Sequence, residues 1–288
     1  PDTIFNTEYF SHNQGHNPAM IKIGALTALT LILLLTNFPA KPVPAQNRFS
    51  YSKSIINKPA LTVDAPLWGV YIPQSGQIIS SSQDAIGIAS LTKLFTALAA
   101  LKNTSHPDQL LVPEELPTPA PLIGFIPKSN ITFSDALQAT LISSGNDAAA
   151  ILGSVNFSAA RELPQQLGLT ATEIVEPTGL NPHNISSVQN MLLIGALVVR
   201  NPLLKEIVSQ KTFTFENRVY SSTNQLLGKG LSGIKTGYLP ETGAHLLGLT
   251  ESDPAIITLV MGTPTQAERF QQTSLLLNQL LRQGILQN

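Results

Sequence analysis

The stretch Ile88-Ala89-Ser90-Leu91-Thr92-Lys93-Leu94-Phe95 places a serine hydroxyl three residues before a lysine amine. After it, apolar residues recur with helical spacing at Leu91, Leu94, Phe95, Leu98 and Leu101. This spacing predicts a helix with one buried face, opened by Ser90. Residues three apart on a helix are neighbours, so the Lys93 amine can reach the Ser90 hydroxyl. If burial keeps the amine neutral part of the time, the pair is a nucleophile with its base.

The same pattern also describes an N-capping serine followed by a surface lysine, so this motif alone does not decide the function. Two further motifs lie downstream. Ser144-Gly145-Asn146 begins 54 residues after Ser90, and Lys235-Thr236-Gly237 begins a further 91 residues on. Each of them alone is typical of an ordinary turn or strand end. Three motifs in order are far more specific than one.

The ordered set S-x-x-K, S-x-N and K-T-G resembles the penicillin-recognising serine acyl-transferases, the superfamily of DD-peptidases and serine β-lactamases. The flanking residues look like the low-molecular-mass D-alanyl-D-alanine carboxypeptidases, in segments 141–149, 176–181, 224–227 and 233–238. This similarity spans residues 60–285. It implies an α/β (α+β) fold of the β-lactamase/DD-peptidase type, with an antiparallel sheet flanked by helices and a helical lobe that holds Ser144-Gly145-Asn146.

The resemblance also implies roles in acyl transfer. Ser90 attacks the peptide carbonyl and Lys93 takes its proton. Ser144, with Lys93 or Lys235, relays a proton to the departing D-alanine. Asn146 orients Lys93 and the substrate amide. No cofactor and no metal ion is implied.

A second group of residues is expected to bind the substrate. By the same resemblance, Lys235 and Thr236 present a cation and a hydroxyl to the terminal carboxylate. Gly237 lets the substrate backbone lie against its strand because no side chain intervenes. The backbone N–H groups of Ser90 and Tyr238 form the oxyanion hole. The expected partners are therefore peptidoglycan stem peptides and β-lactam antibiotics.

Two other functions stay open. A class A-like serine β-lactamase shares the fold and adds a glutamate that activates the deacylating water. Glu176 comes close to that position, but the sequence Glu-Pro-Thr-Gly-Leu-Asn fits the carboxypeptidases better. The other alternative is a peptidoglycan-binding protein that kept the pocket and lost turnover.

Composition excludes several classes of protein. Only 12% of the 288 residues are charged, and the net charge is −1, so no basic surface for nucleic acid is expected. The chain contains no cysteine. Thiol catalysis, disulfides and thiolate metal sites are therefore ruled out.

The N-terminal part differs from the rest of the chain. Residues 1–19 show no periodicity and are interpreted as a non-native segment upstream of a start at Met20. Residues 20–45 contain Lys22 and an apolar run at 23–35, which indicate a signal peptide or, if uncleaved, an N-terminal anchor that is the only membrane contact. Export would place the protein in the periplasm or at the cell-wall face of the membrane. Residues 46–65 are interpreted as a linker.

Residues 66–288 are expected to form one catalytic domain without the β-rich second domain common in the family. Strands are predicted at 68–72 and 77–80, as a hairpin, and at 233–238, 245–250 and 255–261, with antiparallel pairing. Helices are predicted from Thr132, at 188–199 and at 265–281. A further helix is expected to be capped by Asp147, and a short helical segment at 157–172 to be interrupted by Pro164. Residues 103–130 hold six prolines and are predicted to be a loop at the rim of the site.

Overall fold

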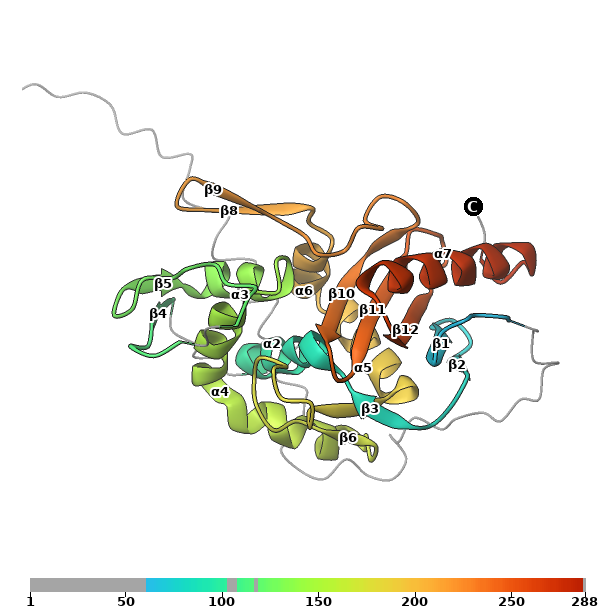
Figure 1. Cartoon of the computed structure of the whole chain (residues 1–288), viewed down its shortest axis with the longest axis horizontal. Helices are drawn as coiled ribbons and strands as arrows, with labels where there is room; N and C mark the ends of the chain where they lie inside the picture. Colours follow the sequence, from blue (N-terminus) through green and yellow to red (C-terminus); the bar gives the residue numbers. More distant parts are fainter. Residues whose placement is uncertain (1–60, 103–107, 117–118, 287–288) are drawn as a thin grey trace, which may run out of the picture. The chain divides into compact units, whose positions relative to one another are not determined.

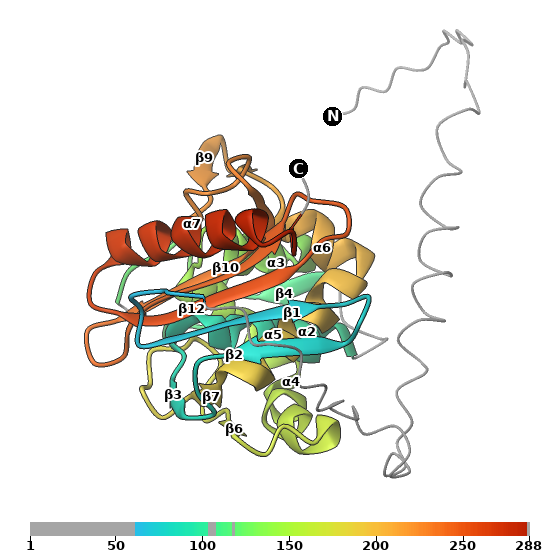
Figure 2. The same cartoon turned by 90° about the vertical axis from the view of Figure 1, so that its right-hand side faces the viewer.

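The computed structural model describes residues 61–102, 108–116 and 119–286, all of which belong to one compact unit. Its centre is an antiparallel sheet with the strand order β10-β11-β12-β1-β2 (Figures 1 and 2). The strands are β1 Leu67–Ile72, β2 Gln77–Ser80, β10 Leu231–Leu239, β11 Gly243–Thr250 and β12 Ile257–Thr263. Strand β1, the first of these strands in the sequence, thus pairs with β12, the last, and Leu67 lies opposite Met261.

Helices cover both faces of this sheet. Helix α7, Gln266–Arg282, lies along one face, as Figure 2 shows, and α5, Val188–Arg200, packs on the other. Successive side chains of a strand point to opposite faces. Val70 therefore belongs to the apolar cluster formed with α7, and its neighbour Tyr71 to the larger cluster formed with α5.

A helical lobe packs beside the sheet (Figure 1). It contains α2 Thr92–Lys102, α3 Phe133–Leu141 and α4 Asn146–Leu167. Helix α2 is its centre, with nine of its eleven residues buried. The short helix α6, Pro202–Val208, follows α5 and contacts α3 and β10. The turn at 89–91, which carries Ser90, lies where the lobe meets the sheet, because it leads into α2 and contacts β10.

Three small sheets complete the described part of the fold. Strands β3 Ala85–Gly87, β7 Ile185–Ser187 and β6 Thr172–Glu173 form one sheet in that order. Strands β4 Gln109–Leu111 and β5 Asn130–Thr132 form the second. The third is a hairpin of β8 Thr212–Phe215 and β9 Arg218–Ser221.

Most of the predicted elements are confirmed. The hairpin at 68–72 and 77–80 forms, the helix after Thr132 is capped by the Thr132 hydroxyl, and the three C-terminal strands pair antiparallel. The apolar helix at 188–199 and the closing helix are α5 and α7. The helices among these segments are long, and the C-terminal strands are nearly continuous apolar runs bounded by turns, so both carry a clear sequence signal.

Three local predictions are wrong. Asp147 does not cap α4, because Gly145 is the N-cap residue and the Asp147 carboxylate instead accepts N–H groups of Ile123 and Gly124. Pro164 does not interrupt a helix, since α4 runs through it to Leu167, and the kink lies at Asn156, where φ is −163°. The predicted loop at 103–130 contains β4, whose three residues pair with β5.

The predicted upstream segment, the signal peptide and residues 46–60 of the linker lie outside the described residues. Among the helices of the described part, none has both the length and the apolar character needed to cross a membrane.

Candidate active site

Ser90 lies in a short 3-10 turn, Ala89–Leu91, that leads into α2, so the helix proper begins two residues later than the sequence predicts. Ala89 adopts a left-handed conformation with φ of 46°, which is rare for a residue with a Cβ atom. The Thr92 hydroxyl donates to the Ala89 carbonyl at 2.7 Å and holds the turn closed. The turn packs on β10, the strand that carries Lys235-Thr236-Gly237.

The Lys93 amine is completely buried and donates to three acceptors. These are Ser90 Oγ at 2.9 Å, Asn146 Oδ1 at 2.8 Å and the carbonyl of Thr178 at 2.5 Å. Burial lowers the pKa of Lys93 from 10.5 to about 7, although the negative charges of Glu176 and Asp147 oppose that change. An amine with this pKa is neutral often enough near neutral pH to accept the Ser90 proton.

The Ser144-Gly145-Asn146 motif forms the turn between α3 and α4. Ser144 has a left-handed backbone, with φ of 63°, and its hydroxyl accepts from the Lys235 amine at 2.8 Å. The Asn146 amide bridges two segments, because Oδ1 accepts from Lys93 while Nδ2 donates to the Pro119 carbonyl at 2.8 Å. The rim segment around Pro119 is thereby joined to the centre of the site.

Lys235 is as buried as Lys93. Its pKa lies well below 10.5 because of burial and because the cations Lys93 and Arg269 lie near it. Next to it, the Thr236 hydroxyl lies 2.6 Å from that of Thr223. The Lys235 and Thr236 side chains on β10 are therefore both held in place by hydrogen bonds, to Ser144 and Thr223.

Gly237 lies directly against the nucleophile turn. A Cβ atom added to it would be 2.9 Å from the Ile88 carbonyl and 3.3 Å from the Ser90 nitrogen, so a side chain would displace the turn. The Gly237 carbonyl accepts from Arg269 Nη1 at 3.0 Å, which holds this part of β10 to α7. Tyr238 follows and is 39% exposed.

The structure thus brings the residues of all three motifs into one site. Ser90, Lys93 and Asn146 form one hydrogen-bonded set, Ser144 and Lys235 form a second, and Gly237 contacts the Ser90 turn. Among the described residues, no cluster of histidine, aspartate and glutamate side chains is arranged to hold a metal ion.

Two groups that take part in the hydrogen bonding of the site, the Thr178 carbonyl and Arg269, were not predicted. The Thr178 carbonyl is a backbone group, and no side-chain pattern identifies it. Arg269 could have been found, because it lies on the buried stripe of α7 with Thr273, Leu276 and Leu280, spaced as i, i+4, i+7 and i+11. A charged residue on a buried stripe needs a polar partner, and here the partner is the Gly237 carbonyl.

Residues 54–265 match the sequence profile of the Peptidase_S11 family, described as D-alanyl-D-alanine carboxypeptidase. The chain belongs to this family. It is therefore a serine peptidase, in agreement with the resemblance drawn from the three motifs.

Relatives of this S11 peptidase carry two kinds of name. A D-alanyl-D-alanine endopeptidase of Pseudomonas aeruginosa is 28% identical over 259 residues, which cover 82% of this chain and 81% of that protein. The D-alanyl-D-alanine carboxypeptidase DacC of Escherichia coli is 27% identical over 245 residues, which cover 76% of this chain and 61% of that protein.

Solved structures show the same fold as this S11 peptidase. Penicillin-binding protein 5 from Haemophilus influenzae aligns with a TM-score of 0.71 and 26% identity, covering 77% of this chain and 72% of that one. Penicillin-binding protein D2 from Listeria monocytogenes, in its cefotaxime-bound form, aligns with a TM-score of 0.68 and 29% identity, covering 77% and 98%. The predicted DD-peptidase-like α+β fold is confirmed.

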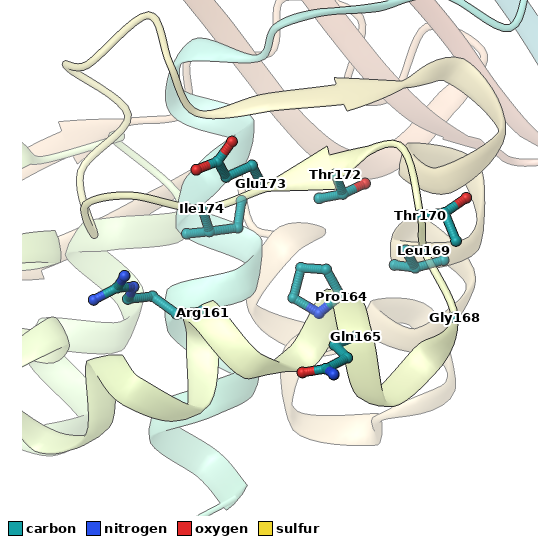
Figure 3. A pocket seen from close by; sticks show the side chains of 9 residues that line it. All are labelled: Arg161, Pro164, Gln165, Gly168, Leu169, Thr170, Thr172, Glu173 and Ile174. Carbon is teal, nitrogen blue, oxygen red and sulfur yellow. The ribbon is translucent and has the colours of Figure 1, made fainter.

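The S11 peptidase also has a surface pocket whose lining residues, within 161–174, belong to none of the three motifs (Figure 3). It has a volume of about 420 Å³ and lies between the second half of α4 and the segment that leads into β6. Arg161 and Glu173 are its charged residues, and Pro164 and Ile174 line it with apolar surface. None of the predicted site residues lines this pocket.

Proposed function

We propose that this chain is a serine D-alanyl-D-alanine carboxypeptidase that removes the terminal D-alanine from peptidoglycan stem peptides through an acyl-enzyme on Ser90. The observation that carries the proposal is the contact of Ser90 Oγ with a buried amine, that of Lys93, whose pKa is about 7. Membership of the S11 family supports the choice of substrate.

In the first half of the reaction, Ser90 Oγ attacks the carbonyl carbon of the D-Ala-D-Ala bond while the neutral Lys93 amine takes its proton. The N–H groups of Ser90 and Tyr238 stabilise the oxyanion that forms. When the C–N bond breaks, the leaving amine takes a proton relayed through Ser144 from Lys93 or Lys235. The Lys235–Ser144 hydrogen bond of 2.8 Å supports this relay.

In the second half, water attacks the ester and the Ser90 hydroxyl is restored. Until the terminal D-alanine departs, Lys235 and Thr236 hold its carboxylate, and Asn146 orients the amide of the substrate. A bound carboxylate beside Lys235 favours the charged amine, because an opposite charge stabilises the protonated form. Binding of substrate therefore restores a positive charge that burial alone disfavours.

Cleavage of a D-alanyl bond inside a longer peptide is the second candidate, because the relative from Pseudomonas aeruginosa is named an endopeptidase. Release of free D-alanine from a peptide ending in D-Ala-D-Ala tests the first candidate, and cleavage of a cross-linked peptide dimer tests the second. Ser90→Ala is the control and abolishes both activities. Binding without turnover by the wild-type protein would leave only a peptidoglycan-binding protein.

A serine β-lactamase is the remaining alternative, and its water would need a free glutamate. Both oxygens of Glu176 accept N–H groups of the same loop, from Thr178 and Gly179. Missing general-base help costs about 10²–10⁴ in rate. A fluorescent penicillin should therefore leave a lasting adduct on the peptide that contains Ser90. Rapid turnover of penicillin without lasting label would instead identify a β-lactamase.

A further inference from the structure

The Glu176 carboxylate is the centre of a dense set of hydrogen bonds. Oε1 accepts from the backbone N–H of Gly179 at 2.6 Å, from Asn181 N–H at 3.3 Å and from Asn184 Nδ2 at 2.5 Å. Oε2 accepts from the N–H and the hydroxyl of Thr178 at 2.7 and 2.6 Å. Every donor belongs to residues 178–184, so the carboxylate fixes the shape of its own loop.

The shaped loop contacts the catalytic helix and the nucleophile turn. The Thr178 carbonyl accepts from the Lys93 amine, and the Pro177 carbonyl accepts from the Thr96 hydroxyl at 2.7 Å. Gly179, with φ of 83°, lies so near Ala89 that an added Cβ atom would be 2.1 Å from its carbonyl oxygen. The loop held by Glu176 therefore sets the position of one of the three Lys93 acceptors.

We propose that Glu176 is a positioning residue for Lys93. The Glu176 carboxylate holds the Thr178 carbonyl against the Lys93 amine and supplies a negative charge near that amine. The inference rests on the proposed function and deepens it. It also explains why a glutamate stands at this place in an enzyme that does not need it to activate water.

The charges around Lys93 come from three elements. Glu176 in the loop and Asp147 on α4 favour the protonated amine, while the cation of Lys235 on β10 lies near it. Asp147 is itself satisfied by the N–H groups of residues 123–125 and 148. Of the two acidic groups, Glu176 has the larger effect on the pKa of Lys93.

The decisive experiment follows the rate of acylation by a fluorescent penicillin against pH. In Glu176→Gln the negative charge is lost, so the acid limb of the profile should move to lower pH by about one pH unit. The plateau rate should fall about ten- to a hundredfold, because the Thr178 carbonyl is no longer fixed. Thermal unfolding of each variant establishes that it is folded.

Two matched variants separate the charge from the shape of the loop. Thr178→Val keeps the charge and the backbone carbonyl and removes only the hydroxyl that donates to Glu176, so it should slow acylation and leave the acid limb in place. Glu176→Asp keeps the charge on a shorter side chain, and its acid limb should also stay near that of the wild type. These two variants also test the inference if Glu176→Gln does not fold.

An acid limb that stays in place in folded Glu176→Gln, or that moves as far in Thr178→Val or Glu176→Asp, would overturn the inference. Failure of the proposed function is a different result. In that case the wild-type protein itself takes no label on Ser90 at any pH.

Discussion

At the scale of single residues, Lys93 links catalysis to stability. Its pKa is lowered from 10.5 to about 7 in the folded protein. Between these two pH values the unfolded chain holds a proton that the folded protein has lost, so the free energy of unfolding rises as the pH rises through this window. Below the window, both states are protonated and the full cost of the buried charge is present. Above it, both states are neutral and the cost is gone.

Lys93→Met should remove this pH dependence, because methionine fills similar space without a titrating group. The difference in unfolding free energy between wild type and variant should change by at most about 1.4 kcal/mol per pH unit between pH 7 and 10.5, in favour of the wild type as the pH rises. Urea denaturation at several pH values measures it. Parallel pH profiles for the two proteins would contradict the lowered pKa.

At the scale of elements, the site depends on how closely the 176–184 loop approaches the nucleophile turn. Gly179→Ala should unfold the protein at clearly lower temperature and remove penicillin labelling, since its Cβ atom would be 2.1 Å from the Ala89 carbonyl. Gly76→Ala is the matched control. Gly76 has a similar φ of 68° but no atom within 4 Å of the added Cβ, so only backbone strain of about 1–2 kcal/mol is expected, with labelling intact. Equal effects of the two substitutions on labelling would refute the close approach.

Elements also show what could be predicted from the sequence. The 3.6-residue period of α7 comes from burial of one face. The long strands β11 and β12 are covered by helices on both faces and therefore appear as nearly continuous apolar runs. In both cases the signal is carried by most residues of the element. Strands β3, β6 and β7 have only two or three residues each, too few for a period, and their sheet joins segments that are distant in the sequence, such as Ala85 and Ser187. Asp147 resembled a cap because its partners, the N–H groups of residues 123–125, are distant in the sequence.

At the scale of the whole molecule, the activity requires that the protein reach the cell wall. We propose that residues 20–45 direct this export. N-terminal sequencing of material recovered outside the cytoplasm should begin near Gln46, with a variant in which the apolar run at 23–35 carries charged residues as the control that stays inside. Mature protein that retains residues 23–35 in the membrane fraction would show an anchor instead of a cleaved signal.

The pairing of β1 with β12 has a consequence for the timing of folding. Leu67 pairs with Met261, so the central sheet lacks one of its inner strands until β12, Ile257–Thr263, has left the ribosome. The Lys235 motif is also synthesised late, 145 residues after Ser90. Contacts between such distant segments form slowly because a long loop must close first. Until residues 231–263 have been synthesised, a growing chain therefore lacks both a complete central sheet and a complete set of the three motifs, so neither the sheet nor the activity can form earlier.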